Sequence, residues 1–225
     1  MATVKVVDLI VRAQTLLQDE DSVRWTVAEL QYWLNDAYKE TIGLRPDVNT
    51  QTAEFTCVAG PRQNITGSFP NAIRLVEVVR NLAPTSDMSS IYVTSRKSLD
   101  TQRRSWYSET PTATIELYTF DPRTPKEFLV YPPATTSARL EVIYSVLPAE
   151  HTLTDTQLFD PTTAETIRID DIFATALFDY MMYRAYSKDA EQTAMMQRAV
   201  AHYQAFQNAL GTKQQVDAAS QPGVA

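Results

Sequence analysis

Hydrophobic positions near the N-terminus recur at the three- and four-residue spacing of an amphipathic helix. Within residues 3–18 the apolar stripe consists of Val6, Leu9, Ile10, Ala13, Leu16 and Leu17. A second helix is predicted to start at Thr26, because Thr26 and Glu29 have the spacing of a capping box. Trp25 and Leu30 flank this box at the positions of a hydrophobic staple. We therefore expect a structural cap made by these four residues.

The C-terminal part of the chain has the same helical spacing. Asp170 and Asp171 are typical of a helix start, and the apolar face after them contains Phe173, Ala176, Leu177, Tyr180 and Met181. After a break at residues 187–189, the seam of a last helix contains Met196, Ala199, Tyr203, Phe206 and Leu210. Gly211 is predicted to end that helix. Because neither hairpin can bury its stripe alone, the two hairpins are expected to pack as a four-helix bundle.

The middle of the chain has the alternating and apolar runs of β-strands. These runs cover residues 54–58, 73–81, 91–94, 114–119, 128–131 and 139–146. Nine of the 12 prolines fall within residues 51–150, where they would interrupt helices repeatedly. The pattern predicts a small antiparallel sandwich or barrel, with a short helix or turn at residues 98–107.

The whole pattern predicts an α+β protein. Residues 1–50 and 162–211 are expected to form the helical bundle, and residues 51–161 the inserted β domain. Residues 212–225 are polar and lack periodicity, which indicates an extended C-terminal tail.

The net charge of −7 and the isoelectric point of about 4.9 argue against tight binding of nucleic acid. Residues 51–150 carry ten basic and ten acidic side chains, so the negative charge belongs to the two ends. One cysteine excludes an internal disulfide, and no apolar run reaches the length of a membrane span. These features favour an intracellular, reducing compartment, with no membrane as partner.

The residues that usually carry chemistry are scarce. Cys57 lies in an alternating run and is interpreted as a buried thiol, while His151 and His202 lack the spacing of metal ligands. No catalytic residue, metal ligand or cofactor is therefore expected, and the protein is not expected to be an enzyme.

One cluster combines basic and aromatic residues, and it is the main candidate for a subunit or partner interface. Arg96, Lys97, Arg103 and Arg104 alternate here with Trp106 and Tyr107. Contact with an acidic neighbouring subunit or with DNA is one interpretation, and a solvated turn around a buried Trp is the other. The remaining interface candidates are Tyr183, Tyr186, Gln214, Gln215 and Val216.

Several short runs together resemble the head-to-tail adaptor proteins of tailed bacteriophages, related to tail tubular protein A. In the N-terminal part they are Leu17-Gln18-Asp19, Arg24-Trp25-Thr26, Glu29-Leu30, Trp33-Leu34-Asn35-Asp36 and Leu44-Arg45-Pro46-Asp47. Further along they are Phe120-Asp121-Pro122-Arg123, residues 128–133 and residues 183–191. The likeness spans nearly the whole chain in the right order. Residues 64–70 depart from it, because relatives often have a shorter Leu-Pro connection there.

The resemblance implies a structural virion protein. Its subunits would form a ring, commonly of twelve, that joins the portal protein to the tail nozzle protein and prolongs the DNA channel. DNA would pass through without tight binding, and the ring would assemble in the host cytoplasm. Two alternatives remain open from the sequence: a receptor-binding or adhesin-like tail module that uses the β domain, and a hydrolase that acts through paired carboxylates.

Overall fold

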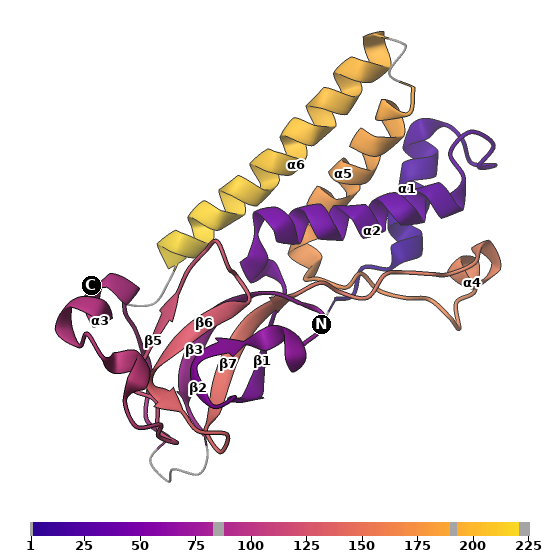
Figure 1. Cartoon of the computed structure of the whole chain (residues 1–225). Coiled ribbons are helices and arrows are strands. Elements are labelled where there is room, and N and C mark those ends of the chain that lie inside the picture. Colours follow the sequence, from indigo (N-terminus) through magenta and orange to yellow (C-terminus); the bar gives the residue numbers. More distant parts are fainter. Residues whose placement is uncertain (1, 83–87, 190–192, 221–225) are drawn as a thin grey trace. The chain divides into compact units, whose positions relative to one another are not determined.

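A computed structural model describes residues 2–82, 88–189 and 193–220, and it shows an α+β protein (Figure 1). The chain divides into two compact units. Residues 1–48 and 148–225 form the helical unit, and residues 49–147 form the β unit. Residues 148–161, which the sequence pattern places with the strands, group with the helices instead, because Leu158 is buried in the helical core.

The helical unit contains α1 (Val6–Leu17), α2 (Val27–Leu44), α4 (Asp155–Phe159), α5 (Ala174–Ser187) and α6 (Thr193–Ser220). Most predicted stripe positions face its core, but Leu16 and Met196 are 50% and 56% exposed. Each lies at the edge of its stripe, beyond the arc of the helix that neighbouring elements cover. Periodicity therefore located the buried faces correctly, and it made the stripes of α1 and α6 one residue too wide.

The expected four-helix bundle is not confirmed. α5 lies at the centre of the unit: α6 runs beside it and α2 crosses it (Figure 1). The segment that leads into α5 supplies Leu158, Ile167 and Ile169 to the same core. Since this irregular segment covers part of the helices' apolar surface, the four long helices do not have to close a core by themselves.

α6 continues to Ser220, so the predicted stop at Gly211 and the extended tail over residues 212–220 are wrong. A glycine inside a helix costs only about 1 kcal/mol relative to alanine, and the neighbouring Ala, Gln and Lys residues favour the helix. Residues 221–225 lie outside the described residues.

The described part of the β unit, residues 49–82 and 88–147, contains seven strands in two sheets. They are β1 (Thr50–Thr56), β2 (Gly60–Asn64), β3 (Ala72–Asn81), β4 (Tyr92–Val93), β5 (Leu117–Phe120), β6 (Glu127–Ala134) and β7 (Arg139–Val146). One sheet has the order β1-β7-β3 and is antiparallel, and the other has the order β2-β6-β5-β4 with a parallel β4–β5 pair. The barrel alternative is therefore wrong.

The two sheets of the β unit share one hydrophobic core. Phe55 of β1 and Phe128 of β6 meet there with ring centroids 5.7 Å apart, and Val142 of β7 is fully buried beside them. A smaller cluster of Leu99, Trp106 and Tyr131 holds α3 (Arg96–Gln102) against the second sheet. This attachment of α3 positions the surface described next.

Candidate interaction surface

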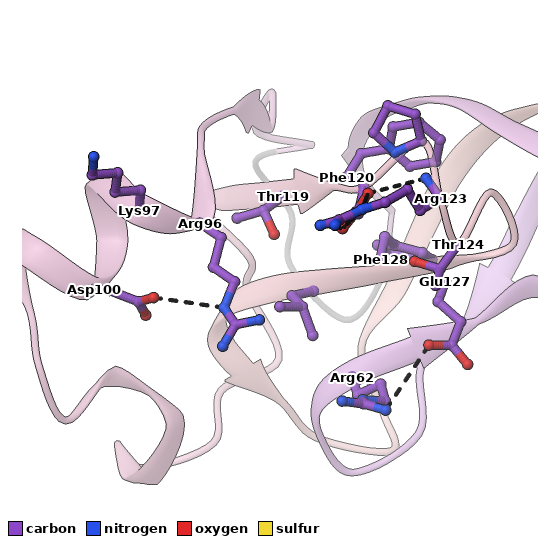
Figure 2. Close-up of a pocket in the computed structure, with 13 residues that line it drawn as sticks. Arg62, Arg96, Lys97, Asp100, Thr119, Phe120, Arg123, Thr124, Glu127 and Phe128 are labelled. Carbon is purple, nitrogen blue, oxygen red and sulfur yellow. Dashed lines mark hydrogen bonds and ion pairs between the residues drawn. The ribbon is translucent and has the colours of Figure 1, made fainter.

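A groove of about 650 Å³ opens in the β unit between the start of α3 and the β5–β6 hairpin. Figure 2 shows that its cations come from separate segments: Arg62 from β2, Arg96 from α3 and Arg123 from the β5–β6 turn. Phe120 and Phe128 supply apolar surface, and Lys97 also lines the groove. We call this surface the basic groove.

The ion pairs within the basic groove are exposed and mostly long. Arg62 lies 3.9 Å from Glu127, and Arg96 lies 3.5 Å from Asp100. Exposed pairs of this kind contribute little to stability, so their guanidinium groups can turn to a partner at small cost. Within the described residues, Lys97 makes no ion pair.

Arg123 and Asp121 form the closest pair in the groove, at 2.7 Å. The guanidinium of Arg123, together with its backbone N–H, lowers the pKa of the Asp121 carboxyl to about 2. Asp121 therefore stays ionised at neutral pH. The turn between β5 and β6 presents a cation and an anion next to each other rather than a purely basic surface.

A buried tryptophan fixes the wall of the groove. The indole of Trp106 donates a 2.9 Å hydrogen bond to Asp100, whose other carboxylate oxygen faces Arg96. Ser95 caps the start of α3 by accepting from the N–H of Ser98 at 3.0 Å. The Trp106 indole thus holds the Asp100 carboxylate in place beside Arg96, at one side of the groove.

The predicted basic and aromatic cluster thus divides into parts with different roles. Arg96 and Lys97 line the groove. Arg103 instead donates to the hydroxyl of Tyr131, and Arg104 is exposed with no ion pair in the described part of the chain. The buried-tryptophan interpretation is the one that describes Trp106, which has no exposed surface.

The tyrosines expected at an interface lie mainly within the helical unit. Tyr186 is only 4% exposed and stacks on His202 of α6, so its placement in an interface is corrected to the core. Tyr183 is half-buried and packs against Tyr203, with ring centroids 4.8 Å apart. These contacts arise because α5 and α6 lie side by side. Periodicity along one helix cannot reveal which of its faces a second helix covers.

The C-terminal candidates lie on α6. Gln215 is exposed, while the side chains of Gln214 and Val216 lie outside what the structure describes. Just before them, the ammonium group of Lys213 lies 4.3 Å from the ring centroid of Phe173. The helical unit therefore holds α6 at least as far as this residue.

The start of α2 joins the two helical hairpins. Thr26 accepts from the N–H of Glu29, and the Glu29 carboxylate accepts from the N–H of Thr26. Leu30 is fully buried, and the Trp25 indole donates a 3.0 Å hydrogen bond to the carbonyl of Ala185 on α5. Trp25 is therefore a structural residue of the helical core.

A buried histidine network, which sequence reasoning missed, fastens residues 148–168 to α2. His151 Nδ1 lies 2.5 Å from the Glu165 carboxylate, and His151 Nε2 lies 3.1 Å from the hydroxyl of Tyr38. The Asn35 side chain bonds both the N–H and the carbonyl of His151, each at 2.9 Å. The sequence carries no signal for this network, because its members are distant along the chain.

Burial sets the titration of the groups in this network. The pKa of the Tyr38 hydroxyl is raised to about 12, and the pKa of His151 is lowered because desolvation outweighs the attraction of Glu165. Cys57 is buried too, which raises the pKa of its thiol to about 12. A thiol of this kind is not a nucleophile at neutral pH.

Residues 2–82, 88–189 and 193–220 contain no group of three or more His, Cys, Asp or Glu side chains placed to hold a metal ion. No helix in these ranges has the length and apolar character needed to cross a membrane.

The basic groove offers charged side chains around aromatic rings, which is the chemistry of a surface that binds other proteins. The family model described as SU10 adaptor protein matches residues 4–225, so the chain belongs to this family. The protein is thus a phage structural adaptor and a component of the virion. No curated protein matches the chain. The resemblance to phage adaptors is confirmed at the level of the family, which favours this role over the receptor-binding and hydrolase alternatives.

Proposed function

We propose that this adaptor forms a ring that joins the portal protein to the tail nozzle protein and prolongs the DNA channel. The observation that carries the proposal is the separation of charge between the two units. The β unit has ten basic and nine acidic side chains, and the helical segments have ten basic and 18 acidic ones. The two parts of each subunit therefore present chemically different surfaces, as two different partners require.

The acidic helical unit also suits a channel for DNA. Its net charge of −8 repels phosphates, so a duplex can pass without being held. A channel requires heterologous contacts that close into a ring, and the likeness to proteins related to tail tubular protein A supports twelve copies. In this proposal the ring assembles on the portal in the host cytoplasm.

Electron microscopy of the purified adaptor mixed with its portal protein tests the ring. At micromolar concentration we expect added density beneath the portal, with the rotational symmetry of a closed ring. Portal particles without added density, at concentrations where the adaptor is folded by circular dichroism, would contradict the proposal.

The C-terminal end of α6 is the segment proposed to contact the portal, through Gln214, Gln215 and Val216. Deleting residues 214–225 removes these side chains and keeps Lys213 on Phe173. We expect a slightly lower helix content, an unchanged Tm and reduced sedimentation of the adaptor with portal particles. Deleting residues 212–225 is the matched control, because it also removes Lys213 and should lower Tm. If the protein that lacks residues 214–225 still attaches fully to the portal, this end of α6 has no role in docking.

A further inference from the structure

We propose that the basic groove of one copy receives residues 19–24 of a neighbouring copy, and that this contact joins successive subunits of the ring. We call residues 19–24 the acidic loop. The inference rests on the proposed ring and names the two surfaces that would build it. The occupant of the groove is a second copy of this chain.

The acidic loop exposes two carboxylates and one apolar side chain to solvent. Within the described residues, Glu20 and Asp21 make no ion pair or hydrogen bond, and both are exposed. Val23, beside them, is 83% exposed, the largest value among the exposed apolar side chains of the described chain. Two carboxylates and one apolar side chain are thus presented together.

The backbone of the acidic loop is held in a fixed conformation. The Asp19 carboxylate accepts hydrogen bonds from the N–H groups of Val23, Arg24 and Trp25 at 2.8–3.0 Å. These bonds lower the pKa of Asp19, with the bond from Trp25 as the largest cause. Gln14 donates a 2.6 Å hydrogen bond to the hydroxyl of Ser22. The backbone φ of Ser22 is 52°, a left-handed conformation that is uncommon for a residue with a side chain.

Arg24 closes the acidic loop at its far end. Its guanidinium binds Asp189, with one hydrogen bond of 2.7 Å, and the Arg24 carbonyl accepts from Lys188 at 2.7 Å. Lys188 and Asp189 directly follow α5, so the loop is tied to a second part of the helical unit. A loop fixed at both ends loses little conformational entropy when it binds, which favours association.

The basic groove complements this loop in charge and in apolar surface. The guanidinium groups of Arg62 and Arg96 are exposed and only weakly paired, as described above, so they can meet Glu20 and Asp21. Phe120 is half-buried in the groove and offers a surface to Val23. The loop belongs to the helical unit and the groove to the β unit, so each copy carries both halves of a head-to-tail contact.

The same groove fits DNA less well. A phosphate backbone that runs along it would meet Asp100, Asp121 and Glu127 as well as the cations, whereas two carboxylates on a short loop can be placed against Arg62 and Arg96. Val23 would also bury no apolar surface against a phosphate backbone. Binding of DNA is therefore the competing outcome of the test.

Charge exchange tests the contact. We expect the double variant Arg62→Glu/Arg96→Glu, and separately Glu20→Lys/Asp21→Lys, to raise the protein concentration for half-assembly on portal by about tenfold, because like charges then face each other. Combining all four substitutions in one chain should restore assembly. Arg104→Glu, an exposed cation outside the groove, is the matched control and should assemble as the wild type does.

Cross-linking gives a readout that does not need the portal. Single variants Val23→Cys and Thr124→Cys keep every charge, and Cys57 is buried and unreactive. When the two are mixed at high concentration with a short bis-maleimide, we expect a cross-linked dimer that neither variant gives alone. Absence of this dimer, or failure of the fourfold charge exchange to restore assembly, overturns the contact.

The outcomes separate the contact from the ring itself. If the wild type adds no density to portal, the proposed ring fails, while the cross-link still decides whether the loop and groove meet. Rings that form equally well with Arg62→Glu/Arg96→Glu refute the contact alone. Loss of fluorescent duplex DNA binding in this variant, without loss of assembly, would assign the groove to DNA.

Discussion

His151 illustrates how one residue can couple stability to pH. In the neutral tautomer of His151 that donates Nδ1–H to Glu165, Nε2 accepts from the Tyr38 hydroxyl, and the hydroxyl oxygen itself accepts from the N–H of Arg168. This arrangement uses every donor only when the imidazole is neutral. Protonation at Nε2 would place two donors, Tyr38 O–H and His151 N–H, against each other.

We therefore predict that stability falls as the pH drops through about 6.5, the ordinary pKa of histidine. The pKa of His151 is lowered by burial in the folded state, so the unfolded chain binds the proton first and mild acid favours unfolding. The measurement is Tm by circular dichroism between about pH 7.5 and pH 5.5. The variant His151→Gln should show a flatter dependence of Tm on pH than the wild type. An equal slope in the two proteins would refute the assignment.

At the scale of elements, Trp25 connects the start of α2 to the end of α5 by burial and by a hydrogen bond. Trp25→Ala removes a buried ring and the hydrogen bond to Ala185. The free energy of unfolding, measured by urea denaturation, should therefore fall by about 3–5 kcal/mol. Trp25→Phe retains most of the apolar surface, and it should lower the free energy of unfolding by about 1 kcal/mol because the indole hydrogen bond is lost. Tyr32→Ala, at an exposed position of the same helix, should change stability little. A small effect of Trp25→Ala on stability with a large effect on ring assembly would instead make Trp25 an interface residue.

The elements also show where local pattern reading succeeds. The capping box and the run of β7 over residues 139–146 were both recognised, because side-chain hydrogen bonds over three residues and strand alternation are local properties. β2 was missed, since Gly60–Asn64 has no apolar alternation and becomes a strand only by pairing with β6. The β propensity of the residues themselves does not predict a strand that forms only because a neighbouring strand pairs with it.

At the scale of the whole molecule, the β unit has its own core and its two ends meet. Asn49 donates a 2.8 Å hydrogen bond to the carbonyl of Val146 and accepts one of 3.0 Å from its N–H. We predict that residues 49–147 fold alone, with a cooperative thermal transition and the circular dichroism of β structure. Val142→Asp, which places a charge at a fully buried position of β7, is the control and should abolish the transition. A disordered wild-type fragment would show that the β unit depends on the rest of the chain.

The sequence by itself determined the order of the parts: helical ends, a β centre and the location of the negative charge. These properties follow from local periodicity, proline positions and composition, which need no knowledge of distant contacts. It also indicated Arg96 and Lys97 as interface candidates, because a basic and aromatic run can be seen along the chain.

Only the tertiary structure decided which of these residues stand together. The basic groove exists because strand pairing brings Arg62 and the turn at Arg123 to the start of α3, and the His151 network exists because residues 148–168 fold back on α2. Tyr186 was assigned to a surface and lies in the core for the same reason, since α6 covers it. Contacts between residues far apart in sequence depend on packing, and packing is not visible in any local pattern.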